Sequence, residues 1–209
     1  MKKRVLAGGT AVALAATMGA GAVGVTSAQA AGNKPLAKVL VNGDFDSKGK
    51  DYDIVTEAVF AVLADAPASP VSLLADGKKR ATAFLPTDKA FKRLASALTG
   101  EQIRTEQAAF EAVAKLGLPV VEEVLLLHVV PGVTITAKQA VMSDGAKLKT
   151  AQGEKLMVDV RKKHSSAPRV FIVDLSRTSS NARVFQVDIN KGNKQIAHGI
   201  KNVLLPKAL

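Results

Sequence analysis

Three histidines are the residues of this 209-residue chain that are best suited to acid–base or metal chemistry. His128 lies on the apolar face of a predicted helix, His164 in a basic loop and His198 in a predicted strand. A catalytic or metal site would need a carboxylate beside one of them, and no spacing makes Asp174 or Asp188 such a partner. We therefore interpret His128 as a buried histidine of the core, and we expect no catalytic residue, no metal and no cofactor.

The sequence also lacks the motifs of the common enzyme classes. It contains no Gly-x-Ser-x-Gly elbow, no His-Glu-x-x-His, no P-loop and no Gly-x-Gly-x-x-Gly run. Cysteine is absent, which excludes disulfides, thiolate metal ligands and a cysteine nucleophile. Aromatic residues make up 4% of the chain, so few side chains could stack on sugars or bases.

One stretch resembles the start of a calcium-binding loop in sequence. The run from Asp44 to Gly49 fits the opening of an EF-hand loop, with Gly at the sixth position. Lys48 and Lys50 occupy positions five and seven, and Val55 stands at position twelve, where a bidentate Glu is needed. Two carboxylates beside two ammonium groups do not make a cation site, so we interpret this stretch as a turn.

The most concentrated polar feature of the chain is positive charge, and the net charge is +11. The basic residues gather at Lys147, Lys149, Arg161, Lys162, Lys163, His164 and Arg169, followed by Lys191, Lys194 and Lys201. If the segments that carry them pack together, they form one anion-binding patch. The alternative is a solvated face that only keeps the protein soluble. Nucleic acid is not expected as the partner, because aromatic residues are scarce.

Helical apolar spacing predominates up to His128. The predicted helices cover residues 53–63, 88–98, 106–116 and 118–128. The core-facing stripe of the second of them consists of Phe91, Leu94, Ala95 and Leu98. Thr87 and Thr105 are the expected N-caps, and Gly117 is expected to end the third helix.

Strand patterns predominate after His128. One strand, at 81–85, precedes the helix that Thr87 caps, and Pro86 ends it. The later predicted strands cover residues 133–136, 147–150, 155–160, 170–175 and 183–189, with a short helix at 137–142. Gly153 marks a hairpin turn. Helices first and strands afterwards are typical of an α+β fold, and the length suits one domain.

The N-terminus has the pattern of a secretory signal peptide. Basic residues 2–4 precede an uncharged stretch that ends at Val25, and Ala-Gln-Ala at 28–30 fits a cleavage site. We expect residues 1–30 to be removed on export, 31–50 to be a lead-in segment and 51–209 to be the single domain, with no membrane span left after cleavage. The alternative is an uncleaved anchor, because the uncharged stretch is long enough to span a bilayer.

Three segments resemble the signature sequences of the fasciclin family. Residues 84–91, Phe-Leu-Pro-Thr-Asp-Lys-Ala-Phe, resemble the first box. Residues 126–132 resemble the Tyr-His segment, but Leu127 replaces its Tyr, so adhesion roles tied to that Tyr do not transfer. Residues 196–206 resemble the second box, with Lys201 in place of its Asp. The matching residues include Phe84, Pro86, Thr87, Asp88, Phe91, His128, Pro131, His198 and Pro206.

The resemblance implies both a fold and a function. The fold is an α+β wedge, in which the C-terminal half forms a β-sandwich-like core and the N-terminal helices pack against it. The function is non-catalytic adhesion, through contacts with an extracellular protein or polysaccharide, by a secreted protein that is free or associated with the cell surface. Two alternatives stay open. One is a binder of an anionic cell-envelope polymer or glycan through the basic patch, and the other is a small-ligand carrier or hydrolase with a pocket that holds a His–carboxylate pair.

Overall fold

The computed structural model describes residues 32–40, 45–162, 167–174 and 180–207. The predicted signal peptide and, in the basic run, Lys163 and His164 lie outside these ranges. The helices are α1 (Ala37–Leu40), α2 (Asp53–Asp65), the 3₁₀ helix η1 (Pro70–Ala75), α3 (Asp88–Thr99), α4 (Glu106–Ala114), α5 (Leu118–Leu127) and α6 (Ala137–Val141). The strands are β1 (Ala81–Pro86), β2 (Val129–Pro131), β3 (Lys147–Lys149), β4 (Lys155–Arg161), β5 (Arg169–Asp174), β6 (Ala182–Ile189) and β7 (Gln195–Ile200).

The seven strands of the described residues form one sheet, in the order β2-β1-β7-β6-β5-β4-β3. β1 lies parallel to β7 with Phe84 opposite His198, so the first and last signature segments are neighbouring strands. The other pairs are antiparallel, and β3 and β4 form the hairpin that Gly153 predicts. β6 bulges between Val184 and Ile189, where its register with β7 shifts.

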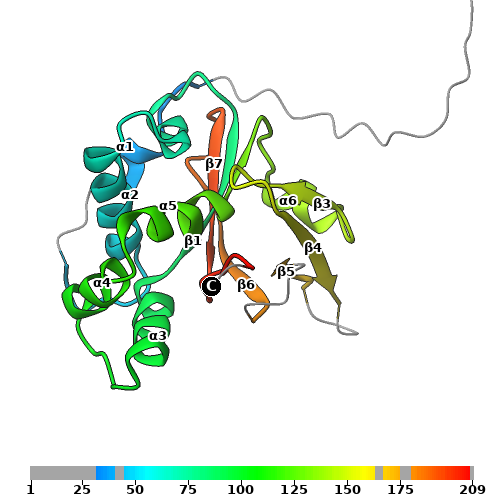
Figure 1. The fold of residues 1–209 in the computed structure, drawn as a ribbon. Coiled ribbons are helices and arrows are strands. Elements are labelled where there is room, and N and C mark those ends of the chain that lie inside the picture. The colour runs from blue at the N-terminus through cyan, green and yellow to red at the C-terminus, as the bar shows by residue number, and fades with distance from the viewer. Residues whose placement is uncertain (1–31, 41–44, 163–166, 175–179, 208–209) are drawn as a thin grey trace, which may run out of the picture.

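Two apolar clusters hold the layers together. The first joins the N-terminal helices to β1, and it includes Ile54 of α2, Val124 of α5 and Leu85 of β1. The second fills the other side of the sheet, where Phe84 of β1 shares a cluster with Val158 of β4. The sheet therefore curves over its own core, while the helices pack against β1 and β7 (Figure 1). The predicted α+β class, with helices packed against a sandwich-like core, is confirmed.

Side-chain caps determine where two of the helices begin. Thr87 Oγ1 accepts a hydrogen bond of 3.3 Å from the Ala90 N–H, and Thr105 Oγ1 accepts one of 3.2 Å from the Ala108 N–H, so both predicted N-caps are confirmed. Gly117 has a different role from the predicted one. It does not end α4 but precedes α5, with a φ of 93° that glycine adopts without strain.

Two further predictions from the apolar pattern are wrong. Leu98 is 46% exposed although Phe91 and Ala95 of the same stripe are buried, because the last turn of α3 extends beyond the surface on which the helix packs. Residues 133–136 form no strand. The Thr82 hydroxyl donates to the Val133 carbonyl and accepts from the Ile135 N–H, each at 2.9 Å, so a side chain of β1 occupies the groups that a ladder would need.

The described residues of the lead-in segment pack against the domain. Leu36 is fully buried, and its N–H donates to Gln195 Oε1 at 2.7 Å. Gln195 Nε2 donates to the carbonyls of Leu73 and Asp76 at 2.6 and 2.9 Å. This buried amide of β7 therefore ties the lead-in segment and η1 to the sheet.

Candidate functional site

The signature carboxylate Asp88 caps a helix other than its own. It is the first residue of α3 and is fully buried. Its Oδ1 accepts a hydrogen bond of 2.8 Å from the Ile54 N–H, and its Oδ2 accepts one of 3.3 Å from the Asp53 N–H. These donors lie at the start of α2, whose N-cap residue Tyr52 provides no side-chain acceptor. Thr87 and Asp88 therefore cap two helices at one corner.

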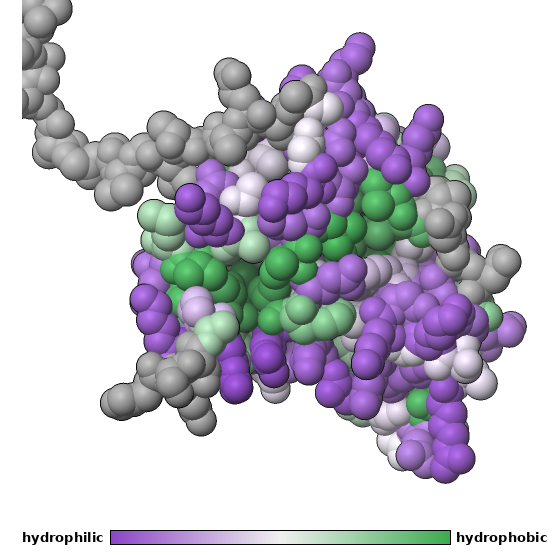
Figure 2. Space-filling view, turned by 180° about the vertical axis from the view of Figure 1, so that it is seen from behind, coloured by the Kyte–Doolittle hydropathy of each residue, from purple (hydrophilic) through white to green (hydrophobic). Residues whose placement is uncertain are grey.

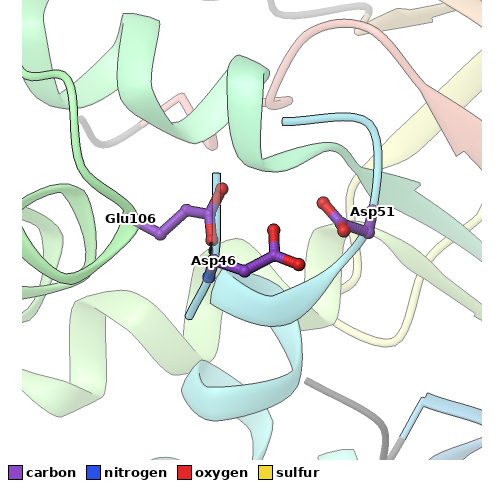
Figure 3. Close-up of side chains that lie close together, drawn as sticks. All are labelled: Asp46, Asp51 and Glu106. Atoms are coloured by element: carbon purple, nitrogen blue, oxygen red, sulfur yellow. Dashed lines mark hydrogen bonds between the residues drawn. The ribbon is translucent and has the colours of Figure 1, made fainter. Parts of the chain in front are cut away.

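Five carboxylates gather at this corner, which we call the acidic corner: Asp46, Asp51, Asp53, Asp88 and Glu106. One oxygen each of Asp46, Asp51 and Glu106 lie within 4.8 Å of one another (Figure 3). The same holds for Asp51, Asp53 and Asp88. Asp53, Asp88 and Glu106 are buried, whereas Asp46 is exposed. The acidic corner thus has a buried side around Asp88 and a solvent-exposed side around Asp46.

Burial and mutual repulsion favour protonation in the acidic corner. Burial, followed by the charges of Asp51 and Glu106, raises the pKa of Asp53 to about 6. Burial is also the main cause that raises the pKa of Asp88, followed by its hydrogen bond with Asp51, while the Ile54 N–H opposes the shift. These carboxyl groups therefore retain protons at a pH where exposed aspartates have lost them.

Lysines compensate part of the negative charge. Lys92 Nζ lies 3.0 Å from Glu106 Oε1, and Lys48 Nζ lies 2.6 Å from Asp46 Oδ2. A metal ion on the solvent-exposed side of the acidic corner would compete with both ammonium groups for the carboxylates. Of the EF-hand-like stretch, Asp44 lies outside the described residues and Val55, at the bidentate position, is buried in α2. We assign no metal to either feature.

His128 and Leu204 join two distant segments. His128 is the residue after α5 and is 3% exposed. Its Nδ1–H donates to the Val124 carbonyl at 2.6 Å, and its Nε2 accepts a hydrogen bond of 3.0 Å from the Leu204 N–H. This pattern requires the neutral ring, and burial lowers its pKa to about 4. His128 thus has no nitrogen free for a substrate or a metal.

His198 has the opposite tautomer and a similar task. Its Nε2–H donates to the Ile135 carbonyl at 2.7 Å, and its Nδ1 accepts a hydrogen bond of 3.3 Å from the Asp188 N–H. Burial lowers the pKa of this ring as well. The Phe84 ring stacks beside it, with centroids 6.2 Å apart. Both histidines therefore bind backbone groups of neighbouring segments, His128 those of α5 and the chain after β7, and His198 those of β6 and the loop before α6.

The other signature residues lie at element ends or in the core. Phe91 and Pro206 are buried. Pro86 is the last residue of β1, which extends one residue beyond the predicted 81–85, and Pro131 is the exposed last residue of β2. None of them carries an ionisable group, so they contribute packing and chain direction.

Basic side chains share the outer face of the β3–β5 strands. We call this set the basic face: Lys147, Lys149, Lys155, Arg161 and Arg169. Lys149 lies opposite Lys155, Arg161 opposite Arg169, and Lys147 opposite Met157, so all five lie on one side of the sheet. Leu156, Val158 and Ile172 point to the other side and are buried. The strands therefore bring together the basic residues of this region, which are all exposed.

Like charges meet directly on the basic face. The pairs Lys149/Lys155 and Arg161/Arg169 oppose each other across strands, an unfavourable arrangement without a counter-charge. Asp159 relieves one pair, since its Oδ2 lies 2.7 Å from Arg161 Nη2. The Arg161 guanidinium also stacks 4.2 Å above the Phe171 ring centroid.

The remaining basic residues lie around this face or away from it. Lys162 follows β4 and is exposed. Lys191 pairs with Asp188 at 3.1 Å and lies with Lys194 between β6 and β7, and Lys201 follows β7. These three are separated from β5 by β6, so the structure does not join them to the basic face.

His198 also lines a cavity of about 250 Å³ between α6 and the β4–β6 strands. Among the described lining residues there is no Asp or Glu. Since both nitrogens of His198 already bind backbone groups, this cavity lacks the His–carboxylate pair that the hydrolase alternative requires.

Comparison with known proteins agrees with the signature segments. The family model described as the fasciclin domain matches residues 60–206, well over half of the chain. The chain belongs to the fasciclin family. None of the curated proteins matches it.

Solved structures show the fasciclin fold independently. The chain is similar to the domain pair of the insect cell adhesion molecule fasciclin I, with a TM-score of 0.52 and 18% identity. The match covers 78% of this chain and 49% of that one, so the chain spans about half the length of the solved chain. At this identity the likeness shows the fold. Fasciclin domains occur in cell adhesion proteins, which supports an adhesion or binding module.

The helices of this fasciclin domain give no sign of a bilayer span. In the described part of the chain, none of them combines the length and hydropathy that crossing a membrane requires.

Two features of this fasciclin domain are not predicted by its sequence, the acidic corner and the cavity. The acidic corner combines residues from the lead-in segment, α2, α3 and α4, and only the closeness of Asp51 and Asp53 is visible in the sequence. The cavity has no local signal at all, because its walls come from seven elements and the turns between them.

Proposed function

We propose that this fasciclin domain is a secreted, non-catalytic adhesion module that binds a protein or polysaccharide outside the cell. The observation that carries the proposal is that Asp88, His128 and His198, the ionisable residues of the signature, are buried and bonded to backbone groups. They build the domain, which leaves recognition to exposed side chains. Secretion follows from the predicted signal peptide, and it leaves the protein free or associated with the cell surface.

The proposal is tested by incubating the purified protein with intact cells, isolated envelope and immobilised matrix proteins. We expect saturable retention on at least one of these materials, without release of soluble peptides or sugars. Release of such products during the incubation would contradict a non-catalytic role. Absence of retention on all of them would contradict adhesion.

The basic face favours a second candidate, an anionic cell-envelope polymer or glycan as the ligand. Its five exposed cations lie on one side of three strands, and like charges oppose each other in the pairs Lys149/Lys155 and Arg161/Arg169, of which Asp159 relieves only the second. A polyanion would relieve this repulsion by lying across the strands. A soluble protein gains nothing comparable from placing like charges opposite each other.

Charge reversal tests this candidate. The double substitution Lys149→Glu and Lys155→Glu reverses one like-charge pair, and both residues are exposed. We expect it to abolish retention on acidic glycan at low salt. Lys78→Glu with Lys115→Glu is the matched control, because it changes the net charge equally at exposed residues of other surfaces. An equal loss in both variants would show a net-charge effect and contradict a role of the basic face.

A further inference from the structure

The cavity between α6 and the β4–β6 strands has apolar walls. Figure 2 shows apolar surface around a hollow on the side of the molecule turned away in Figure 1. Phe84 of β1, Val158 of β4 and Ile172 of β5 line the cavity and belong to the second apolar cluster, and Ala140 of α6 is a further lining residue. An apolar cavity of about 150 Å³ is large enough to hold benzene. The volume here is about 250 Å³, so this cavity has room for a second ring.

Two strands separate at one side of this cavity. The ladder between β5 and β6 ends at the pair Phe171/Arg183. In the same register Val170 would oppose Val184, but these two residues are not paired, and both line the cavity. The gap between the two strands therefore gives the cavity an entrance.

Hydrogen bonds hold the α6 wall of the cavity in place. The Asp188 carboxylate, in the bulged part of β6, accepts a hydrogen bond of 2.7 Å from the Ala137 N–H. Thr136 and Gln139 complete a capping box on α6. The cavity is therefore formed before any ligand binds, and binding does not have to order this wall.

The two arginines among the lining residues, Arg169 and Arg183, bring no charge into the cavity. They alternate along β5 and β6 with Val170 and Val184, whose side chains pack against the second apolar cluster. Successive side chains of a strand point to opposite faces of the sheet, so both guanidinium groups belong to the outer face. Arg183 accordingly lies opposite Phe171, on the side of the basic face.

The other described lining residues are apolar except for His198. Both nitrogens of the His198 ring already bind backbone groups, and burial lowers its pKa, so the ring is neutral. A charged ligand would lose its hydration in this cavity without gaining a counter-charge, which is costly. The cavity therefore disfavours anions and cations alike.

We propose that this cavity binds a neutral, apolar small molecule of about ten carbon atoms, such as a bicyclic hydrocarbon or a monoterpene. The ligand enters between β5 and β6 and lies against Val158, Ile172 and Val184. The His198 ring is bonded on both sides, so the ligand is held and not converted. This ligand site is independent of the adhesive surface proposed above.

Fluorescence titration with naphthalene and two charged derivatives tests the preference for a neutral ligand. The chain has no Trp and one Tyr, so the naphthalene ring emits over little background from the protein. We expect naphthalene to bind to one site per chain, and 2-naphthoate and 2-naphthylmethylammonium to bind at least about tenfold more weakly. Absence of saturable naphthalene binding would overturn the proposal, and so would equal affinity for naphthalene and either ion.

Filling the cavity tests the location of the ligand. Ala140→Leu enlarges a side chain of the α6 wall, and Val184→Phe enlarges one of the β6 wall. Each is expected to weaken naphthalene binding at least about tenfold, and having variants on two elements keeps the test valid if one of them does not fold. The control Ala97→Leu makes the same change at an exposed residue of α3 and should leave the affinity unchanged.

Circular dichroism identifies the folded variants, and their retention on cells or envelope is measured in parallel. We expect this retention to stay unchanged, which separates the ligand site from adhesion. Unchanged naphthalene affinity in a folded filling variant, or an equal loss of affinity in Ala97→Leu, would show that naphthalene does not bind in this cavity and would overturn the proposal.

Discussion

Asp88 Oδ1 lies 2.8 Å from the backbone nitrogen of Ile54, so the carboxylate of the most recognisable signature segment caps the helix that precedes it in the chain. Tyr52, the N-cap residue of α2, offers no acceptor of its own. The neighbouring Thr87 caps α3 in the ordinary way. The Pro-Thr-Asp sequence therefore fixes the relative position of two helices and the end of β1, which is a structural task.

Removing the Asp88 carboxylate should reduce stability. We expect Asp88→Ala to lower the free energy of unfolding by about 1–2 kcal/mol at pH 5, the size of a lost N-cap. Asp88→Asn should lower it by less than half as much, because the amide oxygen still accepts from the Ile54 N–H. Chemical denaturation measures both values. An equal loss for Asn and Ala would show that capping is not the role of Asp88.

The acidic corner should make stability fall as the pH rises. The pKa of Asp53, about 6, and that of Asp88 lie above the unfolded value of 3.8, so the native state holds protons that the unfolded chain releases. The stabilisation is complete below the unfolded pKa and is lost as the pH rises through the folded values. Because Asp51 raises both pKa values, Asp51→Asn should raise the Tm by about 2–4 °C at pH 8 and leave it unchanged at pH 4.

A matched control is available for this pH effect. Glu101 is exposed in the turn after α3, so Glu101→Gln removes one carboxylate away from the corner. Its Tm should equal that of the unsubstituted protein at both pH values, within about 1 °C. A gain from Asp51→Asn that is the same at pH 4 and pH 8 would contradict a coupled titration in the corner.

The titration of His128 should make stability fall as the pH falls, which is opposite to the effect of the acidic corner. Its pKa falls from 6.5 to about 4 on burial, so the unfolded chain takes up the proton first and stability is lost as the pH falls between these values. We expect His128→Gln to be about 1–3 kcal/mol less stable than the unsubstituted protein at pH 7, because the Leu204 N–H loses its acceptor. The difference in the free energy of unfolding between the two proteins should become smaller towards pH 4.5. The acidic corner contributes equally to the stability of both proteins at that pH. A constant difference would show that the ring is not held neutral.

The sequence predicts most of the fold because its local signals agree with the packing. The apolar stripes of 53–63 and 118–128 predict α2 and α5, and Thr87 and Thr105 mark helix starts that the structure confirms. Residues 133–136 mislead, because their apolar alternation resembles a strand while the Thr82 side chain binds their backbone. Such a side-chain contact across 51 residues has no local signature.

The candidate sites are less predictable, for physical reasons. Strand alternation could have placed Lys155 and Arg161 on one face, but the register that sets Arg161 beside Arg169 exists only in the sheet. The cap that Asp88 gives to Ile54, and the backbone groups that His128 and His198 bind, are likewise tertiary contacts. The residue types indicate that these side chains can form hydrogen bonds, but they do not indicate which backbone groups the side chains bind.

The central claim is that recognition belongs to exposed side chains and not to the signature residues. The most direct measurement is retention of the purified protein on cell envelope and acidic glycan across a salt series, with the Lys149→Glu and Lys155→Glu variant and Asp88→Asn in parallel. We predict retention that falls steeply with salt for the unsubstituted protein and Asp88→Asn alike, and none for the charge-reversed variant, since exposed charges are screened. Loss of retention in a folded Asp88→Asn protein would contradict the claim, and full retention of the charge-reversed variant would contradict a role of the basic face.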